Sequence, residues 1–549
     1  MAQLAAFKIP AIENEPNKHY QVGSNEREAL KDALRKLADA SPSKIPCVVD
    51  GEEIKSGVLA EQINPSDKTV LCTYYQSDKV LIQNAIQGAL KAKVAWEAMP
   101  WPDRASVFLK AADLISGKYR AEICASVMLG QGKNVWQAEI DAAAELCDFL
   151  RFGVKYVEDI YSNQPTKNSS GVWNRVEYRP LEGFVLAVTP FNFAAIAGNL
   201  SAAPMMLGNV CIWKPSPMAV HSGYLIYRIF KEAGLPAGVL QFLPCLDAPT
   251  MCETIFSHPD FASLHFTGST KVFKNLWRDI GQKIHVYKSY PRIVGETGGK
   301  NFHLVHASAD VRMTVIESLR AAFEYQGILL VALNVGLYVP VSLWTAKGGF
   351  KDQLVQECSK IKVGPVTDFE CFIAPVISQD AYNKSTHYIK KALEGGGSDS
   401  KGYYVYPTII ETTDPRSITM VEEVFGPVLT VYPYADVDYE KAIDLCDSTT
   451  EYALTGAIFA QDRQVLTQTA RRLEKSAGNF YINTKCTGAV VGQQPFGGSR
   501  SSGTNDKAGS INLLYRFINT RTIKESFVYP EEVLYPSNAP ESGEGIRPV

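Results

Sequence analysis

Two polar side chains stand directly after predicted strands, where α/β sheets place the residues that bind or react with ligands. Asn192 follows the strand predicted for residues 183–188, in the segment Thr189-Pro190-Phe191-Asn192-Phe193. Its side-chain NH2 group could stabilise an oxyanion, or the residue could cap the next helix. Lys214 follows the strand predicted for residues 209–213. It could hydrogen-bond the ribose hydroxyls of a dinucleotide, or it could be a surface lysine at a turn.

A turn that contains glycine precedes the helix predicted for residues 270–283, in the segment Phe266-Thr267-Gly268-Ser269-Thr270. Gly268 would let a phosphate approach the backbone, and Ser269 and the free N–H groups of the helix start could bind it. A plain Thr-Gly-Ser helix cap looks the same. The chain has no GxGxxG motif, so the usual dinucleotide fingerprint is absent.

Three further segments display an acid or an aromatic residue. Glu296 stands among glycines in Gly295-Glu296-Thr297-Gly298-Gly299, which suits a general base that must move and admit water. A carboxylate at a turn or at a helix start is the alternative. Glu423 and Phe496 stand in the turns Glu422-Glu423-Val424-Phe425-Gly426 and Gln494-Pro495-Phe496-Gly497, neither of which is informative by itself.

The elements that must position these residues alternate between strand and helix from residue 183 to residue 285. Such alternation predicts a parallel sheet with helices on both faces, and ligands of open α/β sheets bind at the carboxyl ends of the strands. Apolar periodicity predicts helices over 26–40, 81–98 and most of 104–160, the last with a break at Gly130 and Gly132. A second α/β region, with a strand expected at 405–410, runs from about 300 to 500. The predicted fold class is therefore α/β.

The composition limits which kinds of partner and which cellular compartment are expected for this chain. The chain has 549 residues, enough for two or three domains. Its 55 basic and 58 acidic residues give a net charge of −3, which makes no electrostatic case for nucleic acid or for an anionic membrane. The uncharged stretch 183–213 is interrupted by proline and asparagine, so we expect no membrane span. Eleven cysteines without CxxC or Cys/His spacing predict reduced thiols and no metal site.

The motifs TPFNF, WKPS, FTGST, GETGGKN, EEVFGPV and QPFGG occur in this order. Together they resemble the aldehyde dehydrogenase superfamily over nearly the whole chain. Within that superfamily the chain is similar to the L-glutamate γ-semialdehyde (Δ1-pyrroline-5-carboxylate) dehydrogenases. The segments that carry this finer resemblance include 130–133, 137–146, 478–483, 492–498 and 502–507.

The resemblance implies NAD-dependent oxidation of L-glutamate γ-semialdehyde to L-glutamate, in proline catabolism in the mitochondrial matrix, although the N-terminus shows no clear presequence. A cysteine thiolate would attack the aldehyde, Asn192 would hold the oxyanion, and Glu296 would activate the water that releases the acid. The backbone of Gly488 and Ala489 would bind the substrate's α-carboxylate. NAD would be held by Thr189, Lys214, Gly268, Ser269, Thr270 and Glu423.

The resemblance also implies a domain plan and an assembly. We expect a Rossmann-type NAD-binding domain (1–163 and 181–296), an α/β catalytic domain (297–500) and a β-hairpin oligomerisation flap (164–180 and 513–530). A loose tail would cover 531–549. The expected assembly is a homodimer or a larger homo-oligomer.

The sequence departs from the family where the nucleophile should stand. The flanks, Phe323-Glu324-Tyr325-Gln326-Gly327 and Leu337-Tyr338-Val339-Pro340, match, but residues 328–336 between them do not. Leu330 occupies the position of the cysteine, and leucine has no lone pair with which to form a covalent intermediate. Val331 also replaces a serine that would help to bind the substrate carboxylate.

Two explanations of this block stay open. A misplaced splice junction or a locally shifted reading frame replaces a whole block between intact flanks, and the enzyme would then be active. Alternatively, the block is genuine and the chain is an inactive, NAD-binding partner subunit. Cys486 stands beside the carboxylate-binding loop, so it would lie on the wrong side of the substrate to substitute as nucleophile.

Overall fold

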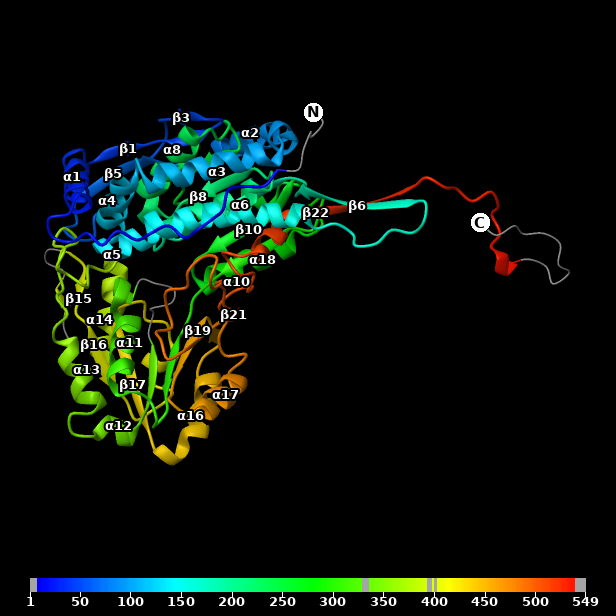
Figure 1. Cartoon of the computed structure of the whole chain (residues 1–549). Coiled ribbons are helices and arrows are strands. Elements are labelled where there is room, and N and C mark those ends of the chain that lie inside the picture. Colours follow the sequence, from blue (N-terminus) through cyan, green and yellow to red (C-terminus); the bar gives the residue numbers. More distant parts are fainter. Residues whose placement is uncertain (1–6, 328–334, 393–396, 399–401, 539–549) are drawn as a thin grey trace.

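A computed structural model describes residues 7–327, 335–392, 397–398 and 402–538 of the chain. Leu330 and Val331, on which the question of the nucleophile depends, lie outside the described residues. The described chain forms two α/β bodies, each built on a sheet, and a hairpin that projects from them (Figure 1). The predicted α/β class is confirmed.

The first sheet has the strand order β11-β10-β7-β8-β9-β2-β3. Its first five strands are parallel, and β2 (Cys47–Val49) and β3 (Glu52–Ile54) close one edge in antiparallel pairing. The parallel strands are β7 (Phe184–Val188), β8 (Cys211–Lys214), β9 (Leu240–Phe242), β10 (Phe261–Thr267) and β11 (Arg292–Glu296).

Helices cover this sheet, as its apolar strands require. β7 and β10 are buried almost throughout, as expected of parallel strands that pack on both faces. The helices that pack against the strands are α2 (Lys79–Ala98), α7 (Ala194–Met206) and α8 (Val220–Ala233), and α10 (Thr270–Gln282) follows β10. The strand and helix alternation predicted for 183–285 is confirmed.

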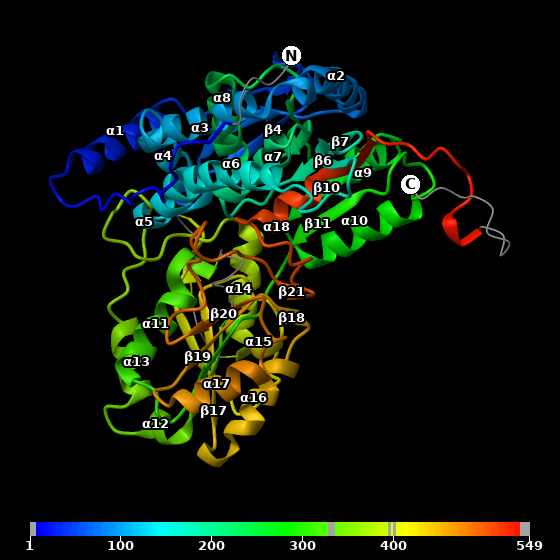
Figure 2. The same ribbon diagram turned by 45° about the vertical axis from the view of Figure 1, so that its right-hand side comes forward.

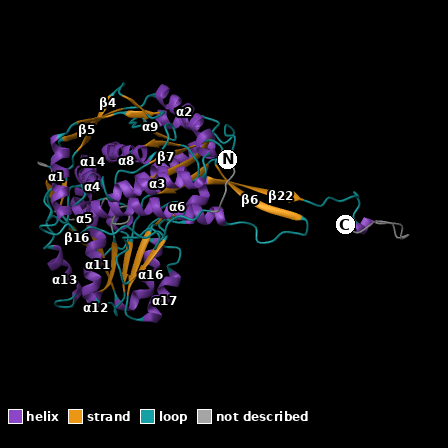
Figure 3. Ribbon diagram, turned by 45° about the horizontal axis from the view of Figure 1, so that its top comes forward, coloured by secondary structure: helices purple, strands orange, loops and turns teal. Residues whose placement is uncertain are grey.

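The second sheet is wholly parallel, in the order β16-β17-β13-β12-β19-β20. Figure 3 shows α11 (Val311–Phe323) and α13 (Phe350–Cys358) on one side of it and α16 (Tyr439–Ser448) and α17 (Arg463–Arg472) on the other. Its strands are β12 (Phe302–Val305), β13 (Gly336–Pro340), β16 (Thr408–Glu411), β17 (Val428–Tyr434), β19 (Thr455–Phe459) and β20 (Asn479–Ile482).

The strand β13, which begins where the unmatched block ends, lies between β12 and β17 in this sheet. Its residues alternate between the two faces, since Leu337 and Val339 pack on one apolar cluster and Tyr338 on another. The described chain therefore continues within the second sheet from Gly336.

One predicted strand was wrong. The strand expected at 405–410 is two strands, β15 (Tyr404–Val405) and β16 (Thr408–Glu411), which join different sheets. Pro407 stands between them. Proline has no N–H with which to continue a ladder of hydrogen bonds, so the pairing ends there.

The projecting hairpin joins two distant segments. β6 (Val172–Pro180) pairs antiparallel with β22 (Ile518–Ser526), from Ile518 opposite Pro180 to Ser526 opposite Val172. Both strands lie within the segments expected to form a flap, and the pair extends away from the body (Figure 1).

The long helical region 104–160 is divided into several helices. Gly132 ends α4 (Arg120–Gln131) in the left-handed region, with φ 68°, and a Cβ at this position would lie 2.8 Å from the carbonyl oxygen of Pro375. After α5 (Val135–Ala138) comes a π-helix, η1 (Glu139–Glu145), which continues directly into α6 (Leu146–Ser162). The break near Gly132 was predicted, whereas the π-helix was not.

No helix among the described residues is long and apolar enough to cross a membrane. The eleven cysteines are all described, and none of them is in a disulfide. At the junction between the two sheets lie β10, β11 and the short helix α18 (Ile511–Leu514), as Figure 2 shows.

Substitution of Gly132 by alanine should lower the stability of the chain by about 2 kcal/mol or more, because the left-handed conformation disfavours a Cβ and Pro375 leaves no room for one. Thermal melting of G132A measures the loss. G281A is the matched control: Gly281 lies in α10, and a Cβ there meets nothing within 4 Å. Equal melting temperatures for G132A and G281A would contradict this prediction.

Candidate active site

A cleft opens at the carboxyl ends of β7, β8 and β10, where the sheet topology predicts ligand binding. Its volume is about 1230 Å³, including the part that is open to solvent. The sequence-predicted residues that line it are Thr189, Asn192, Lys214, Gly268, Ser269 and Glu423. These residues come from separate turns of the chain, and the parallel sheet brings them together.

The turns that line this cleft contribute different polar groups to it. Burial lowers the pKa of Lys214, whose side chain faces the cleft. Ser269 caps α10 by accepting a hydrogen bond from the Val272 N–H at 3.4 Å, so the positive end of that helix lies at the cleft. Thr189 accepts a hydrogen bond from Trp213 Nε1 at 2.8 Å. A basic side chain and a helix N-terminus suit a ligand that carries phosphate.

Glu423 connects the cleft with the loop that carries the candidate base. Its Oε1 accepts a hydrogen bond from the Gly299 N–H at 2.9 Å, and burial raises its pKa. Beside it, burial lowers the pKa of Lys300 to about 7, and Lys300 Nζ donates to the Thr419 carbonyl at 2.6 Å.

Thr270 does not line this cleft with the other predicted cofactor residues. Its hydroxyl accepts a hydrogen bond from the Gly298 N–H at 3.2 Å and donates to the Ser501 carbonyl at 3.3 Å. Thr270 therefore lies where it holds the loop after Glu296, and its place in NAD binding stays a prediction.

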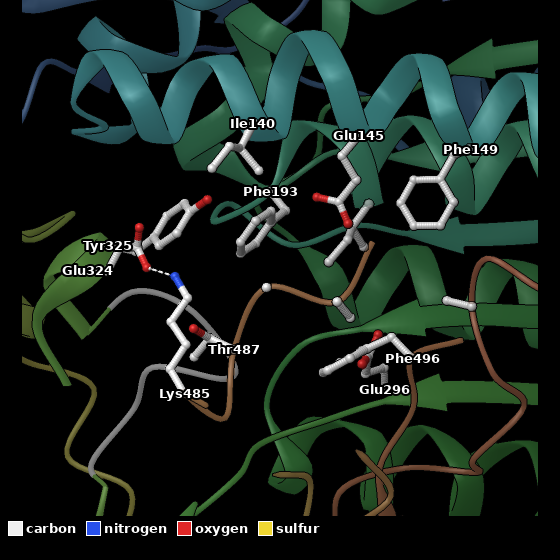
Figure 4. A pocket seen from close by; sticks show the side chains of 14 residues that line it. Ile140, Glu145, Phe149, Phe193, Glu296, Glu324, Tyr325, Lys485, Thr487 and Phe496 are labelled. Atoms are coloured by element: carbon white, nitrogen blue, oxygen red, sulfur yellow. Dashed lines mark hydrogen bonds and ion pairs between the residues drawn. The ribbon is translucent and has the colours of Figure 1, made fainter. Parts of the chain in front are cut away.

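A second cavity, of about 750 Å³, is lined by Phe193, the residue after Asn192 (Figure 4). Glu296, Gly488 and Ala489 line it, so the candidate base and the predicted carboxylate-binding loop share one pocket. The remaining lining side chains are mostly apolar, and they include Phe149, Phe193, Ile196, Tyr325 and Phe496.

Glu296 ends β11 and is half-buried. Its Oε1 has no hydrogen-bond partner among the described residues. Burial raises its pKa to about 8, and the charge of Lys507 acts against that rise. A carboxyl group that titrates near neutral pH and has a free oxygen suits general-base catalysis.

Asn192 is buried at the start of α7. The alternative that it caps this helix receives no support, because Asp141 accepts the hydrogen bonds from Ala194 N–H and Ala195 N–H, at 2.9 and 2.8 Å. Asp141 is in turn paired with the buried Lys133, whose ammonium lies 4.1 Å from the centroid of the Phe193 ring.

Sequence reasoning missed three charged residues of the pocket. Glu145 projects into it from the π-helix, and an ion pair between Lys485 and Glu324 lies at its far side (Figure 4). Burial raises the pKa of Glu145 well above its usual range. The available signal was the run Glu139, Asp141 and Glu145 in an otherwise apolar helical segment.

The comparisons with known proteins agree with this geometry. The model of the aldehyde dehydrogenase family matches residues 53–523. The chain belongs to the aldehyde dehydrogenase family. The predicted family resemblance is thereby confirmed over most of the chain.

Relatives of this aldehyde dehydrogenase extend along almost its whole length. A Δ1-pyrroline-5-carboxylate dehydrogenase of Agaricus bisporus is 55% identical over 98% of this chain and 99% of its own. The mitochondrial enzyme of that name from Homo sapiens is 46% identical over 94% of this chain and 92% of its own. The crystal structure of the Mycobacterium tuberculosis enzyme bound with NAD has a TM-score of 0.92 and 41% identity, covering 98% of this chain and 100% of that one.

Replacement of Glu296 by glutamine should stabilise this aldehyde dehydrogenase above neutral pH and not in acid. The pKa of Glu296 rises from 4.5 to about 8 on folding. Above pH 4.5 the unfolded chain therefore ionises this group while the folded chain keeps it protonated, so its contribution to stability falls as pH rises toward 8. E296Q removes this loss, about 2 kcal/mol for a half-buried group.

Thermal melting at pH 8 and pH 4.5 measures the effect. E451Q is the control, because the hydrogen bond from Lys274 lowers the pKa of Glu451, so its loss should not stabilise the chain at pH 8. A melting temperature of E296Q that equals the native value at pH 8 would show that Glu296 is not held in its neutral form.

Proposed function

We propose that this chain catalyses the NAD-dependent oxidation of L-glutamate γ-semialdehyde, formed from Δ1-pyrroline-5-carboxylate, to L-glutamate. The main observation in support of this proposal is that adjacent residues of the chain line the cleft and the pocket. Asn192 lines the cleft, whereas the adjacent Phe193 lines the pocket together with Glu296. Relatives that span the chain bear the name of this activity.

The pocket offers complementary groups for both charged ends of a semialdehyde amino acid. The loop 487–489 and Lys485 supply backbone N–H groups, a hydroxyl and a positive charge for the α-carboxylate. The hydroxyl of Thr487 is buried and has no hydrogen-bond partner among the described residues. Glu145, whose carboxylate forms no ion pair within the described chain, would bind the α-ammonium group.

NAD fits the first cleft, and when bound it accepts the hydride that leaves the aldehyde carbon. Lys214 and the half-buried Glu423 would bind ribose hydroxyls, and Ser269 with the N-terminus of α10 would bind phosphate. A carboxylate beside the ribose favours NAD over NADP, whose extra phosphate it would repel.

Two residues act on the carbonyl and on water. The amide NH2 of Asn192 donates to the oxyanion that develops on the aldehyde oxygen. The unpartnered Oε1 of Glu296 accepts the proton of the water that releases the acid. The buried Asp141–Lys133 pair holds the backbone beside Asn192, because it fixes the first N–H groups of α7.

The covalent step needs a thiol that Leu330 cannot supply. The comparisons give no support to the alternative of an inactive partner subunit, since the relatives that match the chain end to end are named as dehydrogenases. We therefore expect the expressed protein to carry Gln-Lys-Cys-Ser in place of residues 328–331.

The assembly and the compartment are also proposals. A homodimer or larger homo-oligomer would form through the hairpin of β6 and β22, which extends from the body and exposes Trp173 (50% exposed). Relatives from Emericella nidulans and Dictyostelium discoideum are named as mitochondrial, which supports the mitochondrial matrix as the site of action.

Replacement of Glu145 by glutamine should raise KM for L-glutamate γ-semialdehyde about 10- to 100-fold, because a charged hydrogen bond to the α-ammonium is lost. The aldehyde 5-oxopentanoate has the same chain and carboxylate but no ammonium, so its KM should change little. KM for NAD should stay unchanged. Steady-state NADH formation measures all three constants.

An equal loss for both aldehydes would contradict the assignment of Glu145 to the ammonium group. Turnover of 5-oxopentanoate by the native enzyme as efficient as that of L-glutamate γ-semialdehyde would overturn the proposed substrate.

A further inference from the structure

The segment 502–507 is fastened to the end of the strand that carries Glu296. The Thr297 N–H donates to the Ser502 carbonyl at 3.0 Å, and the Thr504 N–H donates to the Gly295 carbonyl at 2.9 Å. The Gly295 N–H in turn donates to Thr504 Oγ1 at 3.0 Å. These bonds fix the segment relative to Glu296.

The backbone of the segment 502–507 lies so close to the end of β11 that a side chain does not fit at position 503. Gly503 has φ 142°, and a Cβ there would lie 2.5 Å from the carbonyl oxygen of Gly295. Asn505 and Lys507 both have positive φ, 57° and 55°. Non-glycine residues in this conformation are strained, and such strain gathers at functional sites.

Lys507 ends the segment with an ammonium group that neutral acceptors hold. Its Nζ donates to the carbonyls of Gly478 at 2.6 Å and Gly497 at 3.1 Å, and to Asn479 Oδ1 at 3.5 Å. No carboxylate among the described residues forms an ion pair with it. The positive charge of Lys507 is therefore fixed in place and not neutralised by direct contact.

Lys507 and Glu296 line one cavity, of about 420 Å³. The neighbouring Asp506 does not cancel the charge of Lys507 by pairing with it, since Asp506 accepts from Thr504 Oγ1 at 2.5 Å and pairs with Arg516 at 3.4 Å. Among the residues that line this cavity, Lys507 is the one lysine or arginine, so it is the cation that shares the cavity with Glu296.

We propose that Lys507 is a positioning residue for the reaction: its fixed ammonium stabilises the carboxylate form of Glu296, the form that can accept a proton from water. The proposal rests on the proposed function, in which Glu296 is the general base. Lys507 has no N–H left over for Glu296 after its three bonds, so it acts through its charge and not through a direct hydrogen bond.

The other charges around Glu296 do not take over this role. Glu145 faces it from the π-helix, and two carboxylates near each other favour the neutral form of each. Lys485 lies in the pocket but is paired with Glu324. Burial raises the pKa of Glu296 to about 8 and the charge of Lys507 opposes that rise, so removal of the charge should raise this pKa further.

Infrared titration of the protonated Glu296 carboxyl, assigned by its loss in E296Q, tests the proposal in the whole protein without turnover. K507Q keeps N–H donors for the carbonyls and removes the charge, so its midpoint should rise by about one pH unit or more. K507R keeps the charge and should titrate like the native chain. K110M removes an exposed lysine of α3 (Trp101–Ser116), which lines neither cavity that contains Glu296, and should leave the midpoint unchanged.

The proposal is overturned by an unshifted midpoint in K507Q, or by an equal shift in K507R or K110M. NAD binding verifies that each variant is folded, and K507M replaces K507Q should the latter not fold. NADH formation is followed separately, where K507Q should move the acid limb of the pH profile upward. A shifted midpoint in a chain that forms no NADH would count against the proposed function and not against the role of Lys507.

Discussion

Glu296 must lose a proton to act, yet it lies where burial favours the neutral carboxyl. Much of the site is arranged around this conflict. A pocket that excludes water strengthens hydrogen bonds to a developing oxyanion, but it also raises the pKa of the base to about 8. The fixed ammonium of Lys507 favours the carboxylate form of Glu296 and so opposes part of the rise in pKa that burial causes. A base that titrates near neutral pH is the result of these two opposed effects.

The two parallel sheets explain how distant residues reach one point. The first sheet places Asn192, Lys214 and Glu296 at or just after the carboxyl ends of β7, β8 and β11, with β10 between β11 and β7. The second sheet delivers the loop 487–489 after β20 and the turn of Glu423 before β17. Hydrogen bonds between Glu423 and Gly299, and between Thr504 and Gly295, then fasten the two halves on either side of the base.

The site residues that directly follow strands could be predicted from the sequence, because the carboxyl ends of parallel strands lie at the same edge of a sheet. Sequence reasoning placed Thr189, Lys214 and Gly268 correctly near one another for that reason. It did not find Glu145, since a 3.6-residue period cannot reveal a π-helix. Lys507 escaped notice because its neighbours near Glu296 lie more than two hundred residues away in the chain. The break at Pro407 was not predicted, because the apolar run 405–410 by itself indicates a single strand.

Mass mapping of the peptides that cover residues 320–340 of the expressed protein, with an assay of NADH formation on the same sample, tests the central claim most directly. We expect Gln-Lys-Cys-Ser at residues 328–331 and NADH formation with Δ1-pyrroline-5-carboxylate. A peptide that carries Leu330, from a protein that binds NAD but forms no NADH, would contradict it.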